Sequence, residues 1–118
     1  MTDKFVNEIT CILKEDVTTL DNIQERSESI ECLYVQDCKF LKSTQILKDA
    51  PFKKLRDVRI LNCKSLRVVK FGFLKSLTIL FLSNNVITSL NGITPLINLT
   101  MLAVDGNRIS DVNELNYL

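Results

Sequence analysis

Apolar residues recur with a period of 22 over the second half of the chain, from Leu77 to Leu118. The first copy of the pattern has these apolar positions: Leu77, Leu80, Leu82, Ile87, Leu90, Ile93 and Leu96. The second copy repeats the spacing with these residues: Leu99, Leu102, Val104, Ile109, Val112, Leu115 and Leu118. Asn85 and Asn107 occupy the same place in the two copies. A fixed period of this length is typical of a solenoid of stacked repeats.

Each copy predicts a short strand followed by a turn. Leu80 and Leu82 alternate as the inward side chains of a strand do, and strands from successive copies would stack as a parallel sheet on the concave side of the solenoid. Asn85 then turns the chain away from the sheet, and its amide can bond backbone groups that the bend leaves without a partner. The rest of each copy returns across the convex side as a short helix, a 3₁₀ turn or extended chain.

Two earlier repeats continue the pattern toward the N-terminus. A step of 22 residues reaches a repeat with these positions: Leu55, Val58, Ile60 and Cys63. A further step of 25 residues reaches the next one: Ile30, Leu33, Val35 and Cys38. In both repeats cysteine replaces asparagine, and a thiol can make a weaker version of the same hydrogen bond. The predicted repeats are residues 30–54, 55–76, 77–98 and 99–118.

Residues 1–29 do not fit this repeat. Their apolar residues approximate a helical stripe: Phe5, Ile9, Ile12, Leu13, Val17, Leu20 and Ile23. We predict a helical N-terminal cap here, because the core edge of a first repeat must be covered. At the other end the pattern runs to Leu118, so we expect an open C-terminal edge, which favours association with a partner.

Residues 77–93, with the sequence LTILFLSNNVITSLNGI, resemble leucine-rich repeats of the 22-residue class typified by the nuclear regulatory subunit of protein phosphatase 1. The resemblance covers about three quarters of the chain. It implies an α/β fold, a leucine-rich repeat solenoid of about four repeats with a parallel concave sheet. The A-prime protein of a spliceosomal small nuclear ribonucleoprotein has similar repeats. Because such proteins share a scaffold and not a partner, the resemblance predicts fold more sharply than function.

Residues that flank the inward positions should point out of the concave sheet. Those predicted to bind a partner are Tyr34, Arg59, Leu61, Ile79, Phe81, Met101 and Asp105. Aromatic, arginine and methionine side chains are enriched in binding hot spots. Arg59 stands between Tyr34 and Phe81, where it can stack on either ring. The pattern favours a protein-binding face. The alternative is that these outward residues are apolar without function, and that Phe81 only shields the backbone.

Basic residues are concentrated in the middle of the chain, although the net charge is only +1. Residues 38–75 hold 11 basic and 2 acidic side chains, whereas residues 1–37 hold 3 basic and 9 acidic ones. Those predicted to contact phosphate, if adjacent repeats align them into one stripe, are Lys39, Lys42, Lys53, Lys54, Lys64, Arg67 and Lys70. The alternatives are an acidic protein surface as the partner, or a solvated face that keeps the chain soluble.

Residues suited to catalysis are scarce. The chain has no histidine, which excludes the usual serine or cysteine triads, and its four cysteines lack the spacing of a metal site. Its three glycines form no phosphate-binding loop. We therefore predict no enzymatic activity, no metal, no cofactor and no small-molecule substrate.

Hydropathy argues against a membrane partner, because no apolar run approaches the roughly 20 residues that a membrane helix needs. The first residues lack the apolar run of a secretion signal. Free cysteines suit a reducing compartment. We expect an intracellular protein, cytoplasmic or nuclear.

These observations predict a non-catalytic protein–protein interaction module. It would be a subunit or regulator that docks on a larger complex through its concave face or its open C-terminal edge. The first alternative is a ribonucleoprotein subunit that contacts RNA phosphates with the basic central block. The second is a phosphatase-regulatory subunit, which the resemblance suggests.

Overall fold

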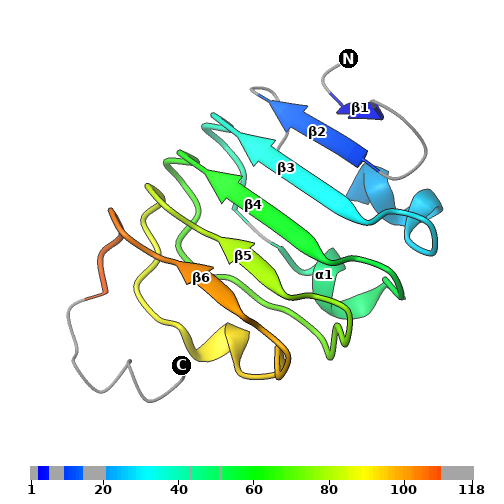
Figure 1. Cartoon of the computed structure of the whole chain (residues 1–118). Helices are drawn as coiled ribbons and strands as arrows, with labels where there is room; N and C mark the ends of the chain where they lie inside the picture. The colour runs from blue at the N-terminus through cyan, green and yellow to red at the C-terminus, as the bar shows by residue number, and fades with distance from the viewer. Residues whose placement is uncertain (1–2, 6–9, 15–20, 43, 51, 110–118) are drawn as a thin grey trace.

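Five strands lie side by side in parallel and in chain order, with a sixth strand antiparallel at the N-terminal edge (Figure 1). The computed structural model describes residues 3–5, 10–14, 21–42, 44–50 and 52–109. The strands have these bounds: β1 Asp3–Phe5, β2 Thr10–Lys14, β3 Cys32–Gln36, β4 Asp57–Leu61, β5 Ile79–Phe81 and β6 Met101–Ala103. The pairs from β2 to β6 are all parallel, so the predicted parallel sheet is confirmed.

Equivalent residues of successive repeats pair across this sheet. Leu33 pairs with Val58, Val58 with Leu80, and Leu80 with Leu102. The strands β3 to β6 therefore fall inside the predicted repeats, one in each. Residues 110–118, at the end of the last predicted repeat, lie outside the described residues, so that part of the prediction is untested.

The described part of the N-terminal segment begins with two strands, so the prediction of a helical cap over residues 1–29 was wrong there. Residues 3–5 and 10–14 are strands, and β2 extends the parallel sheet by one strand beyond the four predicted. Helical structure in this segment is limited, among the described residues, to the 3₁₀ helix η1 at Asp21–Arg26.

The strand β2 forms because its inward residues repeat the alternation of β3. Cys11 pairs with Leu33 and Leu13 with Val35, in each case 22 residues later, and both Cys11 and Leu13 are buried. The apolar spacing of this segment also approximates a helical stripe, but a sheet edge that offers backbone hydrogen bonds outweighs so weak a local preference.

Short helical turns occur in the segments that connect the strands. The helix α1, Ile46–Asp49, follows β3, and the 3₁₀ helix η2, Asn91–Ile93, follows β5 (Figure 1). The core lies between these return segments and the sheet. Its fully enclosed side chains include Ile30, Leu33, Leu41, Leu47, Leu55, Ile60, Leu66, Phe71 and Leu77.

A residue with left-handed backbone conformation turns the chain after each of the strands β3 to β6. These residues are Asp37 (φ 57°), Asn62 (58°), Asn84 (62°) and Gly106 (72°). Aspartate, asparagine and glycine adopt this conformation more readily than other residues. The turn lets the chain leave the sheet within a few residues, which brings the next buried position, Asn85 in the third predicted repeat, under the strands.

Asn85 makes the predicted backbone bonds at this turn. Its Nδ2 donates to the carbonyl oxygens of Ile60 and Leu82, both at 2.8 Å, and its Oδ1 accepts from the Cys63 N–H at 2.8 Å. In the two preceding repeats the thiols of Cys38 and Cys63 donate to the carbonyl two residues back, at 3.4 and 3.5 Å. A hydrogen bond with Cys38 lowers the pKa of Cys63, although burial opposes that shift.

Gly92 is required for close packing between adjacent repeats. A Cβ at this position would lie 1.7 Å from the Val69 carbonyl oxygen, whereas a Cβ at Gly72 would lie 2.8 Å from that of Lys48. The backbone must shift more to admit a methyl group at position 92 than at position 72. We therefore expect Gly92→Ala to lower the free energy of unfolding by about 2 kcal/mol, and Gly72→Ala to lower it by less. Urea denaturation of both variants measures this, and an equal loss would contradict the ordering.

Candidate functional site

The sheet face opposite the core, which corresponds to the predicted concave face, carries outward side chains in two rows. We call it the open face. The first row runs through Ile12, Tyr34, Arg59, Phe81 and Ala103, which pair in that order from β2 to β6. The second row runs through Cys32, Asp57, Ile79 and Met101. Alternation along each strand places these residues on one side and the buried leucines on the other.

Arg59 is held in the centre of the first row by three neighbours. Its Cζ lies 4.7 Å from the Phe81 ring centroid and 5.4 Å from that of Tyr34. Its Nε and one terminal nitrogen, Nη2, each donate to a different carboxylate oxygen of Asp57 at 3.0 Å. Asp57 is only 4% exposed, so its carboxylate has little contact with water. The two hydrogen bonds from Arg59 compensate its negative charge instead.

The ionisation of these groups reflects the same contacts. The hydrogen bonds to Asp57 raise the pKa of Arg59 above its ordinary value, so the guanidinium stays charged. Burial raises the pKa of the Tyr34 hydroxyl, and the Asp57 carboxylate raises it further. At neutral pH the centre of the open face therefore presents a neutral phenol, a phenyl ring and one guanidinium neutralised by one carboxylate.

Apolar side chains continue the open face toward β6. Ile79, Phe81 and Ala103 are half-buried, and Met101 is 51% exposed. Register pairs Ile79 with Met101 and Phe81 with Ala103, so these four side chains form one continuous group, which we call the apolar patch.

The seven residues predicted to bind a partner all lie on the open face or at its margin. The structure brings Tyr34, Arg59 and Phe81 together, and it places Ile79 beside Met101. Leu61 lies at the end of β4, and Asp105 follows β6 and accepts a hydrogen bond from the Ser83 hydroxyl at 2.5 Å.

Four residues of the open face were missing from the predicted set: Ile12, Cys32, Asp57 and Ala103. Strand alternation already points Asp57 outward, because residues two apart on a strand share a face and Asp57 precedes Arg59 by two. The alternation does not indicate its bidentate bond to Arg59. Ile12 was excluded by the mistaken helical assignment of its segment.

The basic residues predicted to contact phosphate are all exposed, but the structure separates them. Lys39 follows β3 and Lys64 follows β4, whereas Lys53 and Lys54 precede β4. Since these strands are parallel, the two pairs lie at opposite ends of the sheet. The remaining three, Lys42, Arg67 and Lys70, are on the return segments. These seven residues are therefore divided between the two ends of the sheet and the return segments, and their contact with phosphate stays a prediction.

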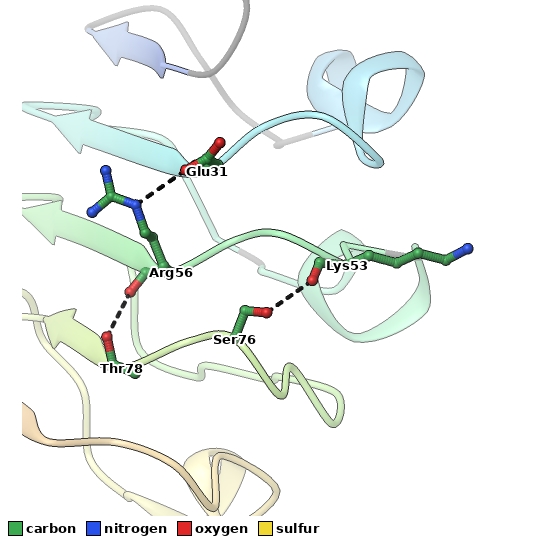
Figure 2. A network of polar contacts seen from close by, with 5 residues as sticks. All are labelled: Glu31, Lys53, Arg56, Ser76 and Thr78. Carbon is green, nitrogen blue, oxygen red and sulfur yellow. Dashed lines mark hydrogen bonds and ion pairs between the residues drawn. The ribbon is translucent and has the colours of Figure 1, made fainter.

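A ladder of polar contacts runs along the edge of the sheet where the strands begin (Figure 2). The Nε of Arg56 bonds a Glu31 carboxylate oxygen at 3.2 Å, and the Thr78 hydroxyl donates to the Arg56 carbonyl at 3.4 Å. The Ser76 hydroxyl donates to the Lys53 carbonyl at 2.9 Å. These bonds join adjacent repeats, and their side chains are largely exposed.

Other kinds of site find little support in the described part of the chain. The four cysteines are all buried, and no three His, Cys, Asp or Glu side chains among the described residues cluster so as to hold a metal ion. Within the same residues, no helix combines the length and hydropathy that crossing a bilayer requires.

Residues 57–109 match the family model for leucine-rich repeats. This part of the chain is therefore similar to leucine-rich repeats. The match spans β4, β5 and β6 and both intervening returns, which are the segments with the most regular 22-residue register. No curated protein is similar enough to the chain to count as a match. Leucine-rich repeat domains generally mediate protein–protein interaction and are typically non-catalytic.

Proposed function

We propose that this leucine-rich repeat chain is a non-catalytic docking module, which serves as a subunit or regulator of a larger complex by holding a segment of a partner protein on its open face. The observation that carries the proposal is the apolar patch beside the held Arg59. Ile79, Phe81 and Met101 leave apolar area in water on the side of the sheet where the fold itself needs none. Covering that area with a partner would be favourable.

The composition of the open face also supports a protein partner. The open face combines aromatic rings, a fixed arginine and, on β6, a methionine, which are residue types enriched in protein interfaces. The stacked and hydrogen-bonded Arg59 loses little side-chain freedom when a partner docks, and this reduces the entropic cost of association.

The C-terminal edge of the described sheet supports a second docking position. Leu80 and Leu82 are fully buried under β5, whereas the equivalent Leu102 and Val104 at β6 are only half-buried. A partner that packs against β6 would complete their burial and continue the sheet.

Two narrower assignments from the sequence remain proposals with different support. The 22-residue register from β4 to β6 is compatible with the class typified by the phosphatase regulatory subunit. Contact with RNA phosphates would draw on exposed lysines at two ends of the sheet, which makes a single binding track less favourable.

Affinity capture from a native extract tests the proposal with two matched variants. Ile79→Lys places a charge in the apolar patch, whereas Ile97→Lys makes the same change at a residue that is 69% exposed and outside the open face. We expect the wild-type chain and Ile97→Lys to retain the same protein partner, and Ile79→Lys to lose it, because a partner cannot bury the new ammonium group without a compensating charge.

Nuclease and salt treatments separate this function from its alternatives. A partner that survives nuclease and high salt and is lost with Ile79→Lys supports the open face. Loss of all partners with nuclease, together with equal capture by both variants, would overturn the proposal in favour of RNA binding through the lysines.

A further inference from the structure

Arg59 has hydrogen-bonding capacity that the chain itself does not use. A guanidinium carries five N–H donors, and Asp57 takes one from Nε and one from Nη2. Both hydrogens of Nη1 and one of Nη2 bond no described residue. One hydrogen of Nη1 and the free hydrogen of Nη2 form the end-on edge of the guanidinium, next to the edge that Asp57 holds, and the side chain is 38% exposed.

The surroundings of these donors constrain what can dock over them. The rings of Tyr34 and Phe81 cover Arg59 at 5.4 and 4.7 Å, and the apolar patch lies on the β6 side. A partner that buries Phe81 would also exclude water from the neighbouring guanidinium. Donors that lose water without gaining an acceptor destabilise the complex, so the partner must supply one.

A carboxylate satisfies this requirement better than a single carbonyl. The Nη1 and Nη2 hydrogens form a planar fork that matches the two oxygens of a carboxylate, and hydrogen bonds between charged groups are about twice as strong as neutral ones. Exposed lysines flank the open face at both ends of β4, Lys54 before the strand and Lys64 after it. Asp37 and Asp105 are exposed after β3 and β6, so the choice of a carboxylate rests on the fork of Arg59, with the two lysines as the nearest cations beside β4.

We propose, resting on the docking function above, that the partner segment carries an Asp or Glu side chain among apolar residues, and that its carboxylate binds the Nη1–Nη2 fork of Arg59 while its apolar neighbours cover Phe81, Ile79 and Met101. Arg59 would then bridge two carboxylates, that of Asp57 in the chain and that of the partner. The bridge makes Arg59 the residue that determines which apolar segments are accepted, since a segment without an acceptor leaves the fork unpaired.

Selection of a displayed random peptide library on the intact chain tests this inference before the partner is identified. Peptides are first sorted by whether their binding is lost with Phe81→Ala, which identifies those on the open face. We expect these to share one acidic position between apolar residues. Replacing that Glu by Gln, or Asp by Asn, in a synthetic copy should weaken binding about tenfold or more.

Two variants of the chain separate the fork from simple charge. Arg59→Lys keeps the positive charge but loses the planar fork, and it should weaken binding of acidic peptides by about tenfold as well. The double variant Asp57→Asn with Arg59→Met removes both charges, so that no unpaired carboxylate is left in the sheet. It should bind acidic peptides no better than their neutral copies, and thermal melts monitored by circular dichroism confirm that each variant is folded.

The outcomes distinguish this inference from the function on which it rests. If the peptides that depend on Phe81 are uncharged or basic, the inference that the partner supplies a carboxylate is wrong, whereas the proposed docking function is still supported. If Arg59→Lys binds the acidic peptides with wild-type affinity, the planar fork of Arg59 is not what recognises the carboxylate. If the selected peptides were insensitive to Phe81→Ala, both the docking function and this inference would fail.

Discussion

Replacing Asn85 with alanine is expected to lower the free energy of unfolding by about 3 kcal/mol, because two buried backbone groups lose a hydrogen-bond partner at about 1–3 kcal/mol each. Asn85 is 4% exposed, and its amide bonds the Cys63 N–H and the Ile60 carbonyl at 2.8 Å. The Leu82 carbonyl is less affected, since Asn107 also donates to it at 2.8 Å. Urea denaturation followed by circular dichroism measures the change.

Two further variants show whether hydrogen bonding is the cause. Asn107 makes similar bonds but is only half-buried, so water can replace its amide, and Asn107→Ala should cost less. Asn85→Cys should fall between wild type and Asn85→Ala, because thiols already occupy this position at Cys38 and Cys63. A loss below about 1 kcal/mol for Asn85→Ala, or an equal loss for Asn107→Ala, would show that the amide bonds are not what stabilises the turn.

The repeated half of the chain could be predicted because two periods agree there. The 22-residue period aligns Leu80 with Leu102, and the alternation of a strand then determines which neighbours point outward. The outward position of Phe81 and Ile79 follows from that alternation alone, without knowledge of their contacts. The position of Arg59 between Tyr34 and Phe81 also follows, because neighbouring strands bring equivalent positions to about 5 Å. Its simultaneous contact with both rings depends on side-chain conformation and is seen only in the structure.

The strand β2 could not be found by the same reasoning because its repeat is incomplete. Glu8 stands 22 residues before Ile30, where an apolar residue was required, so the pattern is interrupted there. Cys11 and Leu13 nevertheless keep the inward spacing relative to Leu33 and Val35. Burial of those two positions beside β3 decides the structure, and this is a tertiary effect that local periodicity does not contain.

The arrangement of the basic block on the surface could not be predicted, for a geometric reason. Spacing along the chain indicates that Lys39 and Lys53 belong to one repeat, but not that the return segment between them carries the chain from one end of the sheet to the other. Because one follows β3 and the other precedes β4, the length of a strand lies between them. Similarly, Asp57 could be assigned to the open face, but its bidentate bond to Arg59 depends on side-chain conformations that the sequence does not determine.

Replacing Phe81 with alanine is expected to weaken partner binding by about 30-fold or more, equivalent to about 2 kcal/mol, while the chain stays folded. Phe81 is half-buried on the outward side of β5, between Arg59 and Ala103. Its removal deletes the largest apolar contact of the open face. It also removes the ring at 4.7 Å from Arg59, so the guanidinium loses part of the support that holds its free edge in place for a partner.

Phe73→Ala is the matched control, because Phe73 is 75% exposed and lies outside the strands of the open face. Titration calorimetry with the captured partner should show a loss for Phe81→Ala and wild-type affinity for Phe73→Ala. Both variants should keep a cooperative thermal transition, since Phe81 covers the outer side of a sheet whose inner side holds the core. Unfolding of Phe81→Ala would mean that its ring stabilises the sheet itself, and equal losses in the two variants would place the interface away from the open face.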